Sequence, residues 1–527
     1  MAALARRAAS PRAGRAPEQP RQPRRARRAG TRAACPLFAG WPGADAPKPR
    51  MRDPASVHSA DGERVLWTID NKRYDVTDYI DAHPGGRDAI LAAQGRSATA
   101  LFRSYHSLSD SAQAVLDRYY VEDAAPGDAD YEDEWEWRST PFHDALNRRV
   151  RAHFERKQAR RERVRGGTVS TAHKAPAWKW AWLGAATVAW AASLAGFLAG
   201  SWAAMLAMPL LYWLGPSSLL HDGMHWSLSV SPRVNGALAA LGGVHMEPTA
   251  WLHQHVIGHH SHTNVVERDP DLDHFTGSGG ASVLQVGGGA ADNAFYGFRC
   301  HAAEPWRPTF GAWKAWLPIM GLLTTVYPSM FESTEMLSRG SFLGRVPLVA
   351  LSRADVARLW LGRALVASVL WVAPFALHGL TLKALAFATL PLFIHGAVYY
   401  VFSQVSHIQP PCFEEPPEGE RFEWAEMQVR HSLDWGNGGV VQTLASIGLN
   451  SQVVHHVYPQ IDPTHYGELR PIFEQTCEEF GIPYHRQPSL WHALRSHVSL
   501  LQDMNRTDVW GASGDGAPAP QAAAAMA

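Results

Sequence analysis

The sequence predicts a multidomain membrane protein in which a small α+β soluble domain precedes an all-α integral-membrane domain. Short β-type alternation surrounds a turn at Asp70-Asn71, which indicates the soluble domain. Further along, four apolar segments are each long enough to cross a bilayer. Histidine-rich motifs follow the second and the fourth of these segments. We therefore expect four transmembrane helices in two hairpins, with a histidine-rich cap on the cytoplasmic side.

The chain of 527 residues is too long for a single compact core, and its composition changes several times along its length. These changes divide it into five parts. The expected parts are a basic disordered or targeting tail at 1–58, the α+β domain at 59–124, a charged linker at 125–176, the membrane domain at 177–510 and a disordered tail at 511–527.

The overall composition limits the function. Acidic and basic residues balance at 49 each, so net charge gives no case for nucleic-acid binding. Four cysteines without a CxxC motif argue against a disulfide framework and a zinc–thiolate site, whereas 26 histidines offer imidazole ligands. Residues 1–50 are Arg-rich and acid-poor, as in an organelle transit peptide. A disordered basic tail, or a leader before a start at Met51, explains the same pattern.

The expected spans are 178–200, 202–220, 358–378 and 382–402. A helix over the first of them would rise about 33 Å, enough for the hydrocarbon core of a bilayer. The first two spans meet at Gly200-Ser201, which predicts a tight helical hairpin. Arg363 lies near the start of the third span, where its long side chain is expected to reach the interface.

Charge predicts the orientation of these spans. Nine Arg or Lys residues within 148–165 directly precede the first span, so this side is expected to face the cytoplasm. The two short loops on the far side hold one base, Lys383. The long segment 221–356 and the C-terminal region then lie in the cytoplasm. Within that segment, 234–250 and 312–331 are apolar but broken by Gly and Pro, as in interfacial helices.

Histidine motifs gather at the predicted cytoplasmic ends of the spans. HDGMH begins where the second span ends, HQHVIGHHSH follows it, FSQVSH ends the fourth span, and QVVHH lies in the C-terminal region. So many imidazoles exceed the four ligands that one zinc ion takes, and they suit two adjacent six-coordinate iron ions. The candidate ligands are His221, His225, His255, His259, His260, His407, His455 and His456.

The sequence leaves the roles of several other residues near these motifs open. His253 and His262 are either additional ligands or ordinary polar residues. His395 lies in the middle of a span, where we expect a neutral, hydrogen-bonded histidine. Carboxylates commonly orient metal-binding histidines through their second ring nitrogen. The candidates for that role are Asp222, Asp269 and Asp271.

The histidine motifs resemble those of the membrane fatty-acid desaturases, over about 59–505. Two features resemble the front-end branch of algal and protist type, whose members carry their own cytochrome b5 domain. Gln452 begins the third motif, where other desaturases have histidine, and HPGG lies in an N-terminal domain. YDVTDYIDAHPGG and SYH are similar to the cytochrome b5 motifs. They imply that His83 and His106 are the axial haem ligands, which leaves the haem to carry electrons only.

The resemblance also implies the cofactors, the partners and the reaction. The eight candidate histidines would bind two non-haem iron ions, Gln452 would take the place of a further ligand, and no other catalytic residue is expected. Haem b would receive electrons from NADH or NADPH through a cytochrome b5 reductase. The expected oxidoreductase uses O2 to insert a cis double bond between the carboxyl end and an existing double bond of a lipid-linked or CoA-linked polyunsaturated acyl chain. Ser403 matches a position where some relatives have a water-bridging Asn.

The sequence departs from the family pattern in two places. Val454 replaces the Glu of Gln-x-Glu-His-His, and Ser97 replaces an Asp of the haem domain. Motifs such as MQVRHSLDWGNGG look like those of enzymes that act at carbon four or five. We expect a multi-pass protein of the endoplasmic reticulum, with a plastid as the alternative, and with both histidine sites facing the cytoplasm.

Two other functions fit the same motifs. A sphingolipid desaturase or a lipid hydroxylase would use the same metal site on another substrate or for another product. A membrane-anchored cytochrome b5 with a defunct desaturase domain would carry electrons without being an enzyme.

Overall fold

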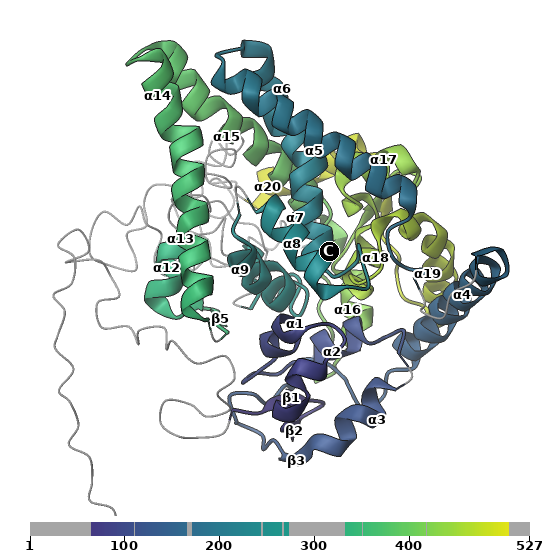
Figure 1. The fold of residues 1–527 in the computed structure, drawn as a ribbon. Coiled ribbons are helices and arrows are strands. Elements are labelled where there is room, and N and C mark those ends of the chain that lie inside the picture. Colours follow the sequence, from purple (N-terminus) through teal and green to yellow (C-terminus); the bar gives the residue numbers. More distant parts are fainter. Residues whose placement is uncertain are drawn as a thin grey trace, which may run out of the picture. The chain divides into compact units, whose positions relative to one another are not determined.

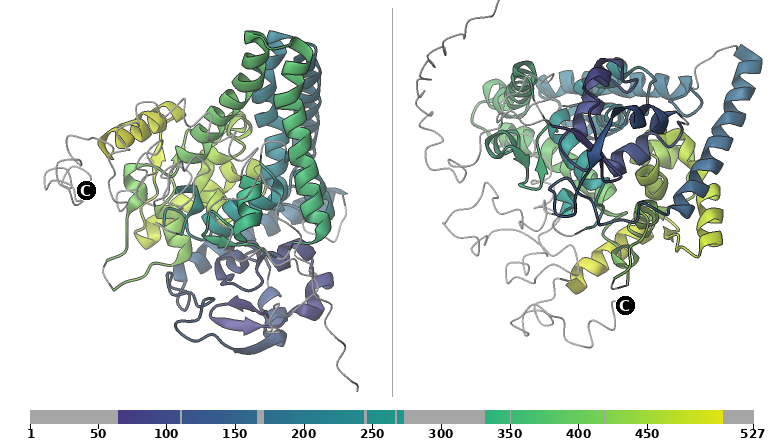
Figure 2. Two further views of the ribbon diagram at one scale, coloured as in Figure 1. Left: turned by 90° about the vertical axis from the view of Figure 1, so that its left-hand side faces the viewer. Right: turned by 90° about the horizontal axis from the view of Figure 1, so that it is seen from below.

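The computed structural model describes residues 65–109, 111–165, 171–243, 246–265, 268–272, 332–349, 351–417 and 419–504. All of them fall within one unit, Asp45–Ala527. Figure 1 and the left view of Figure 2 place the strands β1 to β3 at one end of this unit. The long apolar helices stand together at the other end, and the histidine motifs lie in the helical region between them.

The N-terminal α+β domain is built on a three-stranded antiparallel sheet in the order β1-β2-β3. The strands are β1 (Trp67–Ile69), β2 (Lys72–Tyr74) and β3 (Tyr120–Asp123). The predicted turn joins β1 to β2 with Asp70 and Asn71 at φ of 52° and 57°, a left-handed conformation that Asp and Asn tolerate. The sequence did not indicate β3, because this edge strand is four residues long and fully exposed, so it shows no apolar alternation.

Short helices pack on this sheet around Trp67, Tyr74 and Leu91, which are all buried. Together they enclose the pocket described below. They are η2 (Thr77–Ala82), α1 (Arg87–Ala92), α2 (Thr99–Tyr105), α3 (Ala112–Leu116) and η3 (Asp117–Tyr119).

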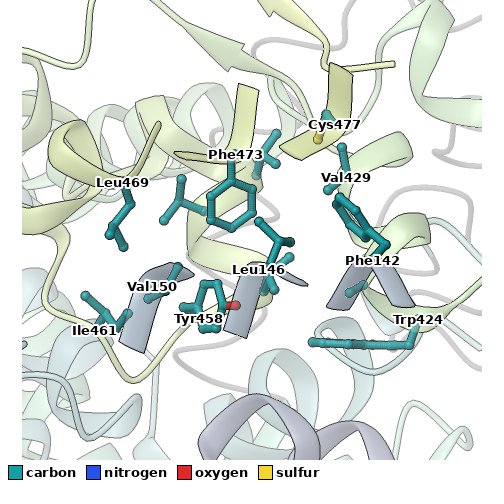
Figure 3. Packing of buried hydrophobic residues seen from close by; sticks show 14 of the residues in the cluster. Phe142, Leu146, Val150, Trp424, Val429, Tyr458, Ile461, Leu469, Phe473 and Cys477 are labelled. Atoms are coloured by element: carbon teal, nitrogen blue, oxygen red, sulfur yellow. The ribbon is translucent and has the colours of Figure 1, made fainter. Parts of the chain in front are cut away.

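The expected linker, 125–176, contains a 25-residue helix, α4 (Pro141–Arg165). Phe142, Leu146 and Val150 recur every four residues, so they share one face of this helix. That face packs against Tyr458 and Phe473 in a buried cluster (Figure 3). The helix is therefore part of the core of the C-terminal region rather than a free connection, and its many charges lie on its other faces.

Four helices are long and apolar enough to cross a membrane, as predicted, among the residues that the structure describes. The first two are α5 (Ala177–Leu198) and a continuous helix of α6 (Trp202–Tyr212), the π-helix η4 (Trp213–Ser217) and α7 (Ser218–Met224). The other two are α13 (Arg353–Ala367) with η7 (Ser368–Val372) and α14 (Ala373–His378), and α15 (Leu382–Gln404).

Details of the spans explain how they turn and what they face. Gly200 has φ of 81°, which only glycine adopts easily, and Ser201 accepts a hydrogen bond from the backbone of the next helix. Leu361 and Leu382 are 72% and 85% exposed, as expected for side chains that face lipid. Arg363 does not reach the interface as expected. It is buried and donates a hydrogen bond to the carbonyl of Gly243 at 3.0 Å.

The region between the sheet and the spans contains most of the elements that carry the histidines. Of the two apolar regions expected to form interfacial helices, the first contains two short helices and 312–331 lies outside the described residues. The elements are α8 (Pro232–Gly242), α9 (Pro248–Trp251), the π-helix η5 (Leu252–His259), α12 (Glu332–Arg339), β4 (Ser341–Phe342), β5 (Val346–Pro347), η8 (Pro410–Phe413), α16 (Trp424–Arg430), β6 (Asp434–Trp435), α17 (Val440–Ser446), η9 (Leu449–Ser451), α18 (Gln452–Val457), η10 (Pro463–His465), α19 (Tyr466–Phe480), β7 (Arg486–Gln487) and α20 (Leu490–Met504).

Candidate metal centre and haem pocket

The structure brings the eight candidate histidines and Gln452 into one buried cluster, where each is at most 9% exposed. Two groups of ring nitrogens lie close enough to share an ion, with the nitrogens of each group within 4.8 Å of one another. We call them the first and the second group. The first group is His221, His225, His255 and His455, and the second group is His259, His407 and His456.

Local helix geometry aims these side chains. His221 lies on α7 and His225 directly follows it, four residues on, so both rings share one face. The second motif lies on the π-helix η5, which carries His255 and His259. π-Helices are rare and frequently occur at functional sites, because they turn side chains that an α-helix would direct elsewhere.

His260 joins the groups, and Gln452 belongs with the second group. His260 Nε2 lies 3.1 Å from His255 Nε2 of the first group, and the His260 ring stacks on His456 of the second group at 4.4 Å between ring centroids. Gln452 Nε2 lies 2.8 Å from His407 Nε2, within the second group. The two groups are therefore adjacent, as a two-ion site requires.

Partners on the other ring nitrogen orient the histidines of the first group. Each of three rings uses Nδ1 in a hydrogen bond with a neighbouring side chain, and its Nε2 is buried without a hydrogen-bond partner among the described residues. A buried, unpartnered nitrogen is costly unless something binds it, which fits a metal ligand. The pairs are His221–Asp222 (2.9 Å), His225–Tyr105 (2.8 Å) and His455–Tyr466 (3.2 Å).

The second group is oriented in the same way by different partners. His259 Nδ1 donates to Asp269, while Asp271 lies 3.7 Å away and accepts from Gln254. All Nδ1 atoms of this group are engaged, which directs Nε2 of each ring toward the centre. The pairs are His259–Asp269 (3.0 Å), His407 with the carbonyl of His431 (3.0 Å) and His456–Gln428 (2.9 Å).

Burial keeps most of these rings neutral, which is the form that binds metal. It lowers the pKa of His407 to about 3 and lowers the pKa of five other rings well below the usual value. For His259, burial also acts to lower the pKa, but Asp269 and Asp271 outweigh it and raise the value to about 9. Neutral imidazoles with few carboxylates form a donor set that iron accepts. The five other rings are His225, His255, His260, His455 and His456.

The histidines with open roles lie outside both groups. His253 uses both nitrogens, in contacts with the carbonyl of Thr249 at 2.6 Å and the amide of Val349 at 2.9 Å. His262 lies 3.5 Å from a carboxylate oxygen of Glu132. Neither ring is directed into the cluster, so neither belongs with the candidate ligands.

A narrow cavity of about 50 Å³ extends from the histidines toward the spans. His221, His255 and His259 border it on one side, and apolar and aromatic side chains form most of the rest. His395 lines it too, with its ring 3.4 Å from the hydroxyl of Ser217. Such a lining suits an apolar chain and excludes water. The apolar and aromatic side chains are Tyr212, Trp213, Leu220, Met246, Trp251, Tyr399, Ile447 and Leu449.

The N-terminal domain holds a second histidine site in a pocket of about 460 Å³. The rings of His83 and His106 face each other across it, with centroids 6.0 Å apart, which leaves room for one ion between them. Each Nδ1 bonds a backbone carbonyl, of Gly86 at 3.1 Å and of Phe102 at 3.0 Å, so each Nε2 is directed into the pocket. Burial lowers the pKa of both rings, to about 4 for His106.

The glycines of HPGG serve this geometry. Gly86 has φ of +88°, a left-handed conformation in which a side chain is strained. A Cβ on Gly85 would lie 2.8 Å from the His83 ring. Both glycines are therefore needed to present His83 to the pocket, which fits a bis-histidine haem.

Sequence reasoning did not find several partners of the histidines. Tyr105 and Gln428 both lie in quoted motifs, SYH and MQVRHS, but their contacts join segments that are far apart in the chain. Tyr466, 11 residues beyond His455, carried no signal. Of these partners, only Tyr105 had a signal in the sequence, which is its position next to the haem-type histidine His106.

This combination defines a membrane-bound oxidoreductase that carries its own electron carrier. Residues 200–488 match the family "Fatty acid desaturase", and residues 53–125 match "Cytochrome b5-like Heme/Steroid binding domain". The chain therefore belongs to the fatty acid desaturases and has a fused cytochrome b5 domain. The cytochrome b5 domain implies haem, and the desaturase family implies iron.

The chain is similar to several proteins named as desaturases over most of its length. "Delta(5) fatty acid desaturase A" of Dictyostelium discoideum is 27% identical over 460 residues, which cover 84% of this chain and 91% of the relative. "Acyl-lipid omega-13 desaturase" of Chlamydomonas reinhardtii is 26% identical, covering 84% and 94%. "Acyl-lipid (8-3)-desaturase" of Mortierella alpina is 24% identical, covering 87% and 98%.

Proposed function

We propose that this desaturase is a front-end enzyme, which inserts a cis double bond between the carboxyl end and an existing double bond of a long-chain polyunsaturated acyl group. The observation that carries the desaturase part of the proposal is the apolar cavity, because both histidine groups border it and residues of the second and fourth spans line it. The Gln at position 452 supports the front-end branch. So do relatives named as Delta(5) and (8-3) desaturases, although one named omega-13 leaves the position open.

The proposed ligands of the two iron ions are the candidate residues of the cluster. The first group would hold one ion and the second group, with Gln452, the other, while His260 lies between them. Bound iron would supply the O2-dependent oxidising chemistry that removes two hydrogens from adjacent carbons. The protein itself positions the chain, because the cavity fixes which carbons lie beside the histidines.

The chain's own residues prepare the site in two further ways. Asp222 and Asp269 accept hydrogen bonds from His221 and His259, which fixes the tautomer and the direction of each ring. Burial of every ring excludes water from the place where the acyl carbons would react. No side chain in this arrangement is needed as a nucleophile.

We further propose that His83 and His106 bind haem and that a cytochrome b5 reductase supplies it with electrons from NADH or NADPH. The nine basic residues within 148–165, just before the first span, favour a cytoplasmic position for both sites. The endoplasmic reticulum is the proposed membrane. The proposed substrate is a lipid-linked or a CoA-linked acyl chain, and the test below is designed to allow for either form.

Product analysis in yeast tests the proposal. Residues 51–527 are expressed with a supply of eighteen- to twenty-two-carbon polyunsaturated acids, and mass spectrometry locates any new double bond. We expect a new bond on the carboxyl side of the first existing one, in the lipid pool that contains the substrate. A matched control carries His456→Ala, which removes a proposed ligand and is expected to give no product.

Other outcomes identify the alternatives. A hydroxylated chain or a desaturated sphingoid base would contradict the front-end proposal and leave the metal site intact. Haem without non-haem iron in purified wild-type protein would favour an electron carrier over an enzyme. A new bond on the methyl side would contradict the regiochemistry alone.

A further inference from the structure

The haem pocket is not closed by the cytochrome b5 domain alone. Residues of the desaturase domain also line it, so the open side of the pocket abuts the membrane domain. Any group bound there would lie between the two domains, on the side where the metal centre is. The residues of the desaturase domain that line the pocket include Trp226, Asn235, Val256 and Gln460.

Hydrogen bonds hold the domains together on both sides of His106. On one side, Ser107 accepts a hydrogen bond from Gln460 at 2.6 Å, and its carbonyl accepts one from Arg151 at 3.0 Å. On the other side, the Tyr105 hydroxyl lies 2.8 Å from His225 Nδ1. The axial histidine is therefore flanked by two residues that both contact the desaturase domain.

The backbone is specially arranged where Tyr105 meets the metal centre. Trp226, which directly follows His225, has φ of 52°, a conformation that large side chains rarely adopt. This turn places the Trp226 ring edge-on against Tyr105 at 5.3 Å between centroids. Tyr105 thus contacts His225 of the first group through its hydroxyl, and its ring packs on the adjacent Trp226.

We propose that Tyr105 is a positioning residue that holds His225 and couples the haem domain to the metal centre. The proposal rests on the proposed roles of His106 and His225 as ligands. A peptide bond joins His106 to Tyr105, and one hydrogen bond joins Tyr105 to His225, so no solvent gap separates the two sites along this route. The electron crosses along this contact.

The step balances without a change at tyrosine. One electron would leave a reduced haem held by His83 and His106, oxidising it to the ferric state, and would reduce a ferric ion held by the first group to the ferrous state. Tyr105 is neither oxidised nor reduced. The proton of the hydrogen bond stays between the Tyr105 oxygen and His225 Nδ1, since Nε2 is the atom directed at the centre.

Tyr105→Phe removes the hydroxyl and keeps the ring that packs on Trp226. Loss of such an orienting hydrogen bond weakens metal sites or their activity by about 10- to 100-fold in other proteins. Tyr120→Phe is the matched control, because Tyr120 belongs to the same domain, is 48% exposed and bonds only Asp123 among the described residues. It lies outside the pocket and the interface.

The test uses the full-length protein loaded with haem and ferric iron, under argon. A short pulse of a reductant reduces the haem. The haem absorbance then reports how fast the electron leaves the haem. The haem reduction potential and the iron content are measured for each variant. We expect an unchanged potential and haem spectrum in Tyr105→Phe, and a rate of haem oxidation per bound iron that is about 10- to 100-fold lower.

An oxidation rate equal to that of wild type, at equal iron content, would overturn the proposal for Tyr105. An equal slowing in Tyr120→Phe would do the same, since the effect would then not belong to this contact. Failure of the proposed function looks different. In that case the wild-type protein itself binds no non-haem iron, or its haem is not oxidised by that iron.

Discussion

In the haem pocket, both histidines are oriented by the backbone of their own segment. His83 and His106 bond carbonyls only three and four residues away in sequence. Some rings of the metal centre instead contact side chains of distant segments, since His225 meets Tyr105 across 120 residues and His456 meets Gln428 across 28. The orientation of the haem-type histidines is thus a property of one short segment, whereas that of the metal-centre rings depends on contacts across the fold.

The largest effect is expected from removing one histidine of each site. His456→Ala should abolish non-haem iron binding at the second group and all product formation, while haem binding persists. His106→Ala should abolish the haem spectrum and leave the non-haem iron in place, because the His106 side chain does not orient any ring of the metal centre. Iron analysis and haem absorbance of the purified proteins check both results.

His262→Gln is the control, because His262 lies in the same motif but outside both groups, beside Glu132 and Glu134 instead. It should keep haem, iron and product. Loss of iron in His106→Ala would show that the two sites are not independent. It would contradict the proposed difference between the haem pocket and the metal centre.

The second prediction concerns the partners of the rings. Asp269→Asn removes a carboxylate that accepts from His259 at 3.0 Å, so iron affinity should fall by about 10- to 100-fold. The haem pocket has no equivalent residue to change, because backbone carbonyls orient its histidines. A chelator competition followed by iron analysis measures the affinity. Asp117→Asn, an exposed carboxylate of the other domain, should leave it unchanged.

The same difference explains what the sequence could predict. The four spans follow from continuous apolar composition, and the haem-type histidines follow from HPGG and SYH, which are local patterns. The residues of the metal cluster were also predicted, and the structure brings them together, although their role as ligands stays a prediction. Each carries its signal within a few residues of the chain.

Features that depend on distant contacts could not be predicted. The Tyr105–His225 contact depends on how two domains pack. The helix α4 looked like a linker because its charges hide three apolar residues whose partners follow about 300 positions later. Arg363 was expected at the interface, but the carbonyl of Gly243 binds it inside the protein. Local composition does not contain this information.

The third prediction uses the departure at Val454. This side chain is fully buried in the same hydrophobic cluster as Phe142 and Tyr458. Val454→Glu, which restores the usual family residue, should therefore destabilise the desaturase domain by roughly 2 to 3 kcal/mol and not strengthen iron binding. Thermal unfolding and iron affinity measure the two effects. Val454→Leu keeps the position apolar and should be milder, and a gain of iron affinity in Val454→Glu would contradict the packing argument.

The smallest effect concerns the stability of the haem domain by itself. Arg73 on β2 donates hydrogen bonds to Asp130 at 2.6 and 2.9 Å and to Asp128 at 2.7 Å, which ties the acidic segment to the sheet. The hydrogen bond from Arg73 lowers the pKa of Asp130 to about 2. Because the folded value lies below the unfolded value of about 4, this stabilisation is present above pH 4 and is lost as the pH falls toward 2.

Arg73→Met should lower the stability of the haem domain by about 1 kcal/mol at pH 7, since solvent screens a pair that is partly exposed. The difference from wild type should shrink between pH 4 and pH 2, because protonation of Asp130 removes the same interaction. Urea-induced loss of the haem absorbance measures this, and iron content should not change. Arg87→Met, which breaks a more exposed pair with Asp81, should have little effect at any pH. A difference in stability that stays constant down to pH 2 would show that Arg73 acts through packing. A parallel loss of iron would show that the haem domain supports the metal centre through more than the Tyr105 contact.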